Sequence, residues 1–144
     1  MEKAKLAVGT WIRLMKSYNL ILRRTRRRIK ECTLSQFDVL AQLERHPEGV
    51  TFSELSKELL VTAGNLTGVV DRLEKSGLVV RSSVPTDRRS VLLRLTEKGD
   101  TLAKRLIARH RRDLKFVFSV LTEEELVQLR NLLDKLQQAL EEEK

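Results

Sequence analysis

The sequence is poor in the residues that build disulfides, metal sites and catalytic centres. It has one cysteine, Cys32, so no disulfide can form within the chain, which fits a reducing compartment. A structural zinc site needs about four ligands, and the only histidines, His46 and His110, have no cysteine partners at a suitable spacing. A glycine-rich phosphate loop is also missing. We therefore expect neither an enzyme nor a bound cofactor or metal.

Long apolar runs are missing as well. No stretch approaches the roughly 18 apolar residues that a membrane span requires. Arg13 and Lys16 interrupt the N-terminal segment before it reaches the apolar length of a signal peptide. We therefore expect a cytoplasmic protein that does not enter a membrane.

Acidic residues are too few to balance the basic ones. The 144 residues include 28 Lys and Arg against 20 Asp and Glu, which gives a net charge of +8 and a pI of about 10.0. The excess is strongest in residues 1–30, where Glu2 is the only acid. Such an excess favours a polyanionic partner, either nucleic acid or an anionic membrane surface, and nucleic acid is the preferred interpretation.

Helical periodicity predicts long helices at both ends of the chain. One apolar stripe runs along residues 4–30, and leucines recur at spacings of three and four over residues 126–140. The first stripe consists of Trp11, Met15, Tyr18, Leu22 and Ile29. Because such seams often pair with a second chain, we expect residues 1–32 and 100–144 to form dimerisation helices around a DNA-binding region at 33–99. All three parts would belong to one intertwined domain.

Several threonines are placed where helices should begin. Thr33, Thr51 and Thr122 are each followed three residues later by Gln or Glu, which predicts a capping box at the start of three helices. Thr96 is expected to cap a further helix that begins near Glu97.

The middle of the chain predicts two short helices joined by a tight connection. One covers about residues 52–59, and the next covers about 63–76, with Thr62 as its N-cap and Gly77 as a left-handed residue after its end. The inward face of the second helix is given by Leu66, Val69, Val70 and Leu73. This arrangement is typical of a helix-turn-helix.

The hydrophobic period changes from helical to strand-like after Gly77. Residues 78–84 and 90–95 are rich in β-forming types, and Pro85 to Arg89 between them contain turn formers. The sequence therefore predicts a β-hairpin with a basic tip directly after the two helices.

The second helix of a helix-turn-helix lies in the major groove of DNA, with its N-terminal residues toward the base edges. The residues in that position here are Thr62, Ala63, Gly64, Asn65, Thr67 and Gly68. Asn65 could pair with adenine, Thr67 could donate or accept a hydrogen bond, and the glycines permit a close approach. The expected phosphate contacts are Ser35, Arg72 and Arg94. The alternative is an ordinary polar face on an amphipathic helix.

The basic hairpin tip predicts a second contact. Arg88 and Arg89 are expected to reach a narrow A·T-rich minor groove, where the potential is strongly negative. Asp87 is expected to stabilise the wing, by accepting backbone N–H bonds or by pairing with an arginine. A solvated charged hairpin is the alternative.

Three motifs together resemble the MarR family of bacterial and archaeal regulators. They are Asn65 to Val79, Pro85 to Ser90 and Leu95 to Gly99, and the resemblance also covers Thr33 to Leu43 and the flanking helices. It implies a mainly α fold with a small β-wing, in which a winged helix-turn-helix lies between long N- and C-terminal dimerisation helices. It implies a homodimer that reads a pseudo-palindromic operator in double-stranded DNA, with Arg88 in the minor groove. It also commonly implies a pocket for a small aromatic or anionic effector.

Two features stay open at this point. Some relatives sense peroxides through a cysteine, usually inside the first helix, and the cations near Cys32 could lower its thiol pKa. The arginine cluster at 23–28 could be a solvated helix end, a phosphate contact or an anion-binding wall of an effector pocket.

The motifs and the charge together indicate a sequence-specific transcriptional regulator. It is expected to act as a repressor that occupies a promoter and is released by a small molecule. The alternative function is that of a non-specific, architectural DNA-binding protein.

Overall fold

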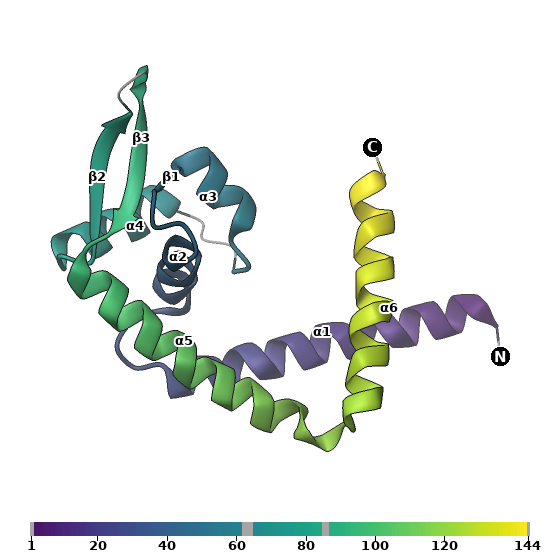
Figure 1. Cartoon of the computed structure of the whole chain (residues 1–144). Helices are drawn as coiled ribbons and strands as arrows, with labels where there is room; N and C mark the ends of the chain where they lie inside the picture. Colours follow the sequence, from purple (N-terminus) through teal and green to yellow (C-terminus); the bar gives the residue numbers. More distant parts are fainter. Residues whose placement is uncertain (1, 62–64, 85–86, 144) are drawn as a thin grey trace. The chain divides into compact units, whose positions relative to one another are not determined.

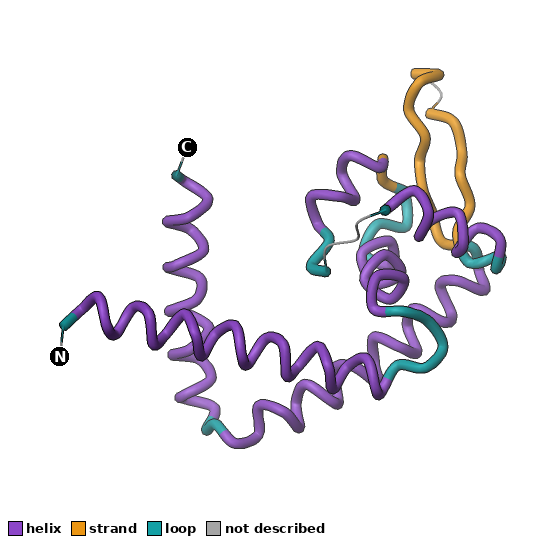
Figure 2. Tube along the Cα trace, turned by 180° about the vertical axis from the view of Figure 1, so that it is seen from behind, coloured by secondary structure: helices purple, strands orange, loops and turns teal. Residues whose placement is uncertain are grey.

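The computed structural model describes residues 2–61, 65–84 and 87–143, and for residues 87–90 it describes the backbone only. The elements in chain order are α1 (Lys3–Arg28), α2 (Leu34–Glu44), β1 (Val50–Thr51), α3 (Phe52–Glu58), α4 (Leu66–Lys75), β2 (Val79–Val84), β3 (Asp87–Leu95), α5 (Glu97–Val117), the 3-10 turn η1 (Phe118–Val120) and α6 (Glu123–Glu142) (Figure 1). Helices account for most of the described chain, and strand is confined to one hairpin and the short β1 (Figure 2). The predicted mainly α fold with a small β-wing is confirmed.

The chain divides into two compact units, Met1–Arg109 and His110–Lys144. The first unit contains the helix-turn-helix and the hairpin, and the second contains η1 and α6.

The three predicted capping boxes are present. At the start of α2, the Gln36 N–H donates to the Thr33 hydroxyl at 3.1 Å, and the Thr33 N–H donates to the Gln36 side chain at 2.9 Å. The same pair of bonds opens α3 at Thr51 and α6 at Thr122. Each box satisfies backbone N–H groups that the first turn of a helix leaves without partners.

The core of the first unit lies where α2 packs against α3, α4 and β3. Its largest fully buried side chains are Leu40, Leu43, Leu55, Leu73, Leu93 and Leu106. Val70 and Leu73 are buried on α4, and Leu66 and Val69 pack against the same cluster while remaining half-buried. The inward stripe expected for this helix is therefore confirmed.

The strands form one antiparallel sheet in the order β1–β3–β2. The hairpin register pairs Val79 with Leu95 and continues to Ser83 with Val91, after which an irregularity leads to a Val84–Asp87 pair. β3 begins at Asp87, so the backbone of Arg88 and Arg89 belongs to the strand rather than to the turn that was expected at 85–89. The two-residue strand β1 was not predicted, because two residues carry no period.

Gly77 ends α4 as expected. Its φ of 73° lies in the left-handed region that glycine adopts without strain. The N–H of Leu78 donates to the Leu73 carbonyl at 2.9 Å and that of Gly77 to the Glu74 carbonyl at 3.0 Å, which is the Schellman pattern. This closure places the start of the hairpin directly after the helix.

Apolar side chains on α1 and α6 are unusually exposed. Trp11 on α1 is 60% exposed, and Leu136 and Leu140 on α6 are 48% and 59% exposed. Among the helices that the structure describes, none is long and apolar enough to cross a membrane.

Candidate nucleic-acid interface

Helix α4, the predicted DNA-reading helix, begins later than the sequence suggested. It starts at Leu66 with Asn65 as its N-cap, rather than at Ala63 with Thr62 as the cap. The predicted contact residues Thr62, Ala63 and Gly64 lie outside the described residues. The reason for the later start is the Asn65 side chain, whose oxygen accepts the Gly68 N–H at 2.9 Å and so supplies the cap.

This cap changes the interpretation of two predicted contact residues. Bidentate pairing with adenine uses both the oxygen and the nitrogen of the amide, and the Asn65 oxygen is occupied by Gly68. A Cβ added to Gly68 would lie 2.5 Å from Asn65 Nδ2 and 3.0 Å from Cγ. The lack of bulk at Gly68, which we attributed to a close approach of DNA, is therefore already required by the cap.

Thr67 and Arg72 occupy the exposed side of α4, as expected for residues that meet DNA. Ser35 lies half-buried in the first turn of α2, and Arg94 is exposed on β3, opposite Val80 of β2. The three predicted phosphate contacts, Ser35, Arg72 and Arg94, thus come from three different elements. Asn65 and Gly68 are the predicted base contacts that the structure brings into direct contact with each other.

The side chains of Asp87, Arg88 and Arg89 lie outside what the structure describes. Their backbone forms the beginning of β3, at the far end of the hairpin from α4 and α5 (Figure 1). The roles of the two arginines in the minor groove stay predictions.

Arg81 on β2 joins the wing to the helix pair, and the sequence did not single it out. Its guanidinium pairs with Asp71 on α4, and its Nε lies 3.5 Å from a Glu74 carboxylate oxygen on the same helix. It also lies over the Phe52 ring of α3, 5.5 Å from the centroid, as in a cation–π contact. One side chain therefore holds three elements of the candidate interface together.

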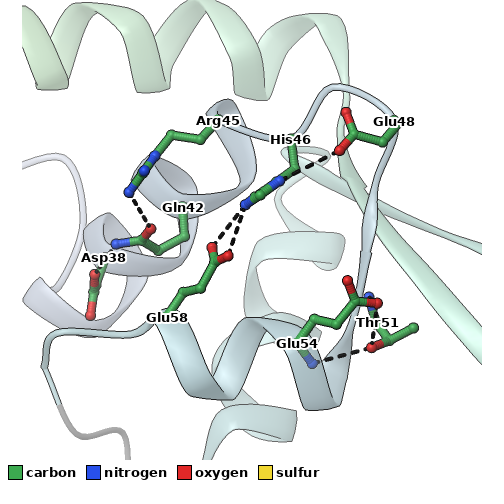
Figure 3. Close-up of polar contacts among 8 residues, drawn as sticks. All are labelled: Asp38, Gln42, Arg45, His46, Glu48, Thr51, Glu54 and Glu58. Carbon is green, nitrogen blue, oxygen red and sulfur yellow. Dashed lines mark hydrogen bonds and ion pairs between the residues drawn. The ribbon is translucent and has the colours of Figure 1, made fainter. Parts of the chain in front are cut away.

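His46 is held by two carboxylates rather than placed as a metal ligand. Its Nε2 lies 2.8 Å from a Glu58 oxygen at the end of α3, and its Nδ1 lies 3.5 Å from Glu48 (Figure 3). The hydrogen bond with Glu58 raises the pKa of His46 above its usual value, while burial opposes the rise. Within the described ranges, no group of three or more His, Cys, Asp or Glu side chains could hold a metal ion.

Cys32 is not activated by its basic surroundings. Burial raises the pKa of its thiol to about 11, and the neighbouring Glu31 carboxylate adds to the rise. Glu31 pairs with Arg109 and lies 3.9 Å from Arg105. The expectation that nearby cations lower the pKa of Cys32 is therefore wrong, because burial and the Glu31 carboxylate raise it, and thiolate is scarce at neutral pH.

The chain is similar to proteins of one family. A sequence model described as MarR family matches residues 32–90. The HTH-type transcriptional repressor MdtR of Bacillus subtilis is 35% identical over 76% of this chain and 70% of its own length. The chain spans between 64% and 70% of the length of three curated relatives, all named as HTH-type transcriptional regulators or repressors.

Solved structures of DNA-binding regulators resemble nearly the whole chain. The FabT protein of Streptococcus pneumoniae, solved in complex with DNA, has a TM-score of 0.75 and 28% identity, and the match covers 97% of this chain and 99% of FabT. The BpsR protein of Bordetella bronchiseptica has a TM-score of 0.76 and 26% identity, over 90% and 92% of the two chains. Its DNA binding is described as regulated by 6-hydroxynicotinic acid. A winged helix-turn-helix, relatives that are regulators rather than enzymes, and sequence identity over most of the chain identify this protein as a member of the MarR family of transcriptional regulators.

Proposed function

We propose that the chain acts as a homodimer that binds a pseudo-palindromic operator in double-stranded DNA and represses transcription by occupying a promoter. Residues 33–99 bind the DNA, and residues 1–32 and 100–144 hold the two copies together. The observation that carries the proposal is the amphipathic α4, which buries Val70 and Leu73 and leaves Thr67 and Arg72 exposed beside the wing.

The major-groove contact rests on α4 and the residues before it. Thr67 is the best-placed base contact among the described residues, because its side chain is exposed one position into the helix. The Asn65 amide nitrogen stays available as a donor to a base acceptor while its oxygen caps the helix. Thr62, Ala63, Gly64 and Gly68 complete the proposed reading face.

Phosphate contacts and the wing supply the rest of the affinity. Ser35, in the first turn of α2, lies where the helix dipole favours an anion. Arg72 and Arg94 add positive charge from α4 and β3. Arg88 and Arg89 extend the contact into the flanking minor groove, with Asp87 stabilising the wing.

The homodimer is supported by the exposed apolar faces of α1 and α6. Large apolar side chains such as Trp11 and Leu140 are more than half exposed in the single chain, which is costly in water unless a second surface covers them. A two-fold dimer places two identical α4 helices on two half-sites, roughly one helical turn of DNA apart.

The proposals of a repressor role and of a small-molecule effector are supported by what related proteins are described as doing. MdtR is named a repressor, and DNA binding by BpsR is described as regulated by an aromatic acid, 6-hydroxynicotinic acid. By analogy, we infer that a small aromatic or anionic compound binds this protein and releases it from DNA. The arginine cluster at 23–28 is one candidate wall for such an anion.

The test is selection of bound fragments from the source genome, followed by affinity measurements on the selected operator and on random DNA at two salt concentrations. A specific regulator should prefer its operator by about 10³-fold or more. A ratio near one would instead favour the architectural alternative.

Arg88 tests the wing in the same assay. Arg88→Ala should weaken operator binding and reduce the salt slope by about one unit, because one fewer counterion is released. Lys135→Ala removes an equal charge from the side of α6 that faces away from the leucines at 126–140, and it serves as the matched control. An unchanged Arg88→Ala variant would mean that the wing is only a charged hairpin.

A further inference from the structure

Asp38 is a buried acid that none of the predicted contacts uses. It lies in the middle of α2 and is only 5% exposed. Removing a carboxylate from water is costly unless hydrogen bonds replace the lost solvent. Its oxygens must therefore have partners, and those partners show what the residue does.

The partners of Asp38 Oδ2 are two successive backbone N–H groups. Leu60 donates at 2.6 Å and Val61 at 2.7 Å. The other oxygen, Oδ1, accepts from Gln42 Nε2 at 3.3 Å, one turn further along α2. Bonds to an ionised acceptor are roughly twice as strong as neutral ones, so this contact fixes the backbone at Leu60 and Val61 firmly.

Leu60 and Val61 lie at a sensitive position. They follow directly after α3, which ends at Glu58, and they precede the N-cap of α4 at Asn65. With only seven residues, α3 cannot hold its own end in place by helix formation alone. The carboxylate on α2 therefore determines where the chain leaves α3 on its way to α4.

A second contact, from a residue just beyond the end of α2, reaches the same end of α3. His46 pairs with Glu58, the last residue of α3 (Figure 3). Between the two contacts, Gln42 bonds to Asp38 and accepts from Arg45 at 3.5 Å. Polar side chains on α2 and just after its end thus contact Glu58, the last residue of α3, and the backbone N–H groups of Leu60 and Val61.

We propose that Asp38 is a positioning residue for DNA recognition, which fixes the backbone of Leu60 and Val61, between α3 and α4, before DNA arrives. The inference rests on the proposed function, in which α4 reads bases. Without the carboxylate, Leu60 and Val61 must be ordered at each binding event. Ordering about two residues per half-site corresponds to a half-site affinity about 30- to 1000-fold lower. Binding to random DNA depends on phosphate contacts and should change less than about threefold.

The experiment compares Asp38→Ala, Asp38→Asn and the control Val39→Ala in the full chain. Val39 is fully buried beside Asp38, so its truncation destabilises α2 without touching the connection. Two quantities are measured for each protein: amide hydrogen exchange at Leu60 and Val61, and the ratio of operator to random-DNA affinity.

Asp38→Ala should lose protection at both amides and lower the affinity ratio about 30- to 1000-fold per half-site. Asp38→Asn keeps an oxygen for the two N–H groups but loses the charge, so it should restore part of the protection and give a ratio between those of Asp38→Ala and the wild type. Val39→Ala should keep the ratio despite its lower melting temperature. If Asp38→Ala does not fold, Asp38→Asn decides: exposed amides with an unchanged affinity ratio, or a lowered ratio with both amides still protected, would contradict the inference.

Three results overturn the proposal. One is unchanged exchange at Leu60 and Val61 in Asp38→Ala, and another is an unchanged affinity ratio. The third is an equal loss of ratio in Val39→Ala, which would make the effect one of general stability. A wild-type protein that prefers no DNA sequence overturns the proposed function as well, and amide exchange then shows separately whether Asp38 holds the connection.

Discussion

Gly99, in the first turn of α5, is the position where a single methyl group should do most harm. A Cβ there would lie 1.9 Å from the Leu78 carbonyl oxygen and 2.8 Å from the carbonyl carbon. The obstacle is backbone, so no side-chain rotation can relieve it. The same Leu78 oxygen accepts the Thr96 N–H at 3.0 Å. Thr96 also donates to the Gly77 carbonyl at 2.6 Å and accepts the Gly99 N–H at 3.0 Å.

The magnitude of the effect of Gly99→Ala follows from these contacts. Moving the methyl to an acceptable distance requires α5 to retreat from Leu78 by about 1 Å or more. Overpacking of this kind costs about 1–3 kcal/mol, and a weakened Thr96 to Leu78 bond costs about 1 kcal/mol more. The higher helix propensity of alanine over glycine offsets about 1 kcal/mol of this loss of stability. We expect a net loss of about 2 kcal/mol, and more if the backbone cannot move.

The assay is thermal and urea unfolding at one fixed protein concentration, because dimerisation makes the melting temperature depend on concentration. A loss of about 2 kcal/mol corresponds to a melting temperature lower by roughly 6–8 °C for a chain of this size. Gly9→Ala is the matched control, since a Cβ there meets only the flexible Arg13 guanidinium at 3.1 Å. The control should gain a little stability. A Gly99→Ala protein as stable as the wild type would refute the reasoning.

Three further predictions concern pH, the wing and assembly. Glu58 raises the pKa of His46, so the pair stabilises the fold below the unfolded pKa of about 6.5 and loses that effect as pH rises through the higher folded value. His46→Gln should therefore cost stability, below about 1 kcal/mol, at pH 6 but not at pH 9 in urea titrations. Arg81→Met should reduce amide protection in β2, and combining it with Asp71→Asn should be non-additive, because the two side chains form one ion pair; additive effects would contradict the pairing. Leu136→Asp should shift the protein to monomer in sedimentation velocity, because a dimer interface would bury the new charge; an intact dimer would place the interface elsewhere.

Local signals in the sequence predicted local structure well. The capping boxes at Thr33 and Thr51 each involve residues three apart, so the partners are visible in the sequence itself. The left-handed Gly77 follows from glycine's freedom after a helical stripe. Helix periodicity found Val70 and Leu73 because burial on one face repeats with the helix turn.

Competition between local signals explains the error at the start of α4. Thr62 and Asn65 are both good N-caps, and apolar periodicity after them does not say which is used. Asn65 caps the helix by bonding to Gly68, where the missing side chain leaves room for the amide. The lack of a side chain at Gly68 was recognised from the sequence, but Asn65 was assigned to a base contact rather than to the N-cap.

Contacts between distant residues could not be predicted from the sequence. Asp38 and Leu60 are 22 residues apart, and an acid on a helix is ordinarily a surface residue. The signal available was an acid flanked by Phe37 and Val39 in an apolar run, which places it near the buried side of α2. That placement indicates a buried partner but does not identify one.

The residues proposed to contact DNA differ from the residues that position α4 and the wing. Thr67 and Arg72 are exposed. They can be identified from the sequence because they are polar residues outside the apolar stripe of the helix. Asp38 is buried, and Arg81 is committed to Asp71 and Phe52. Such residues can change specificity without touching a base, since the direction of α4 and of the wing depends on them. Differences in operator choice among related proteins should therefore be sought on these supporting contacts as well as on the exposed face of α4.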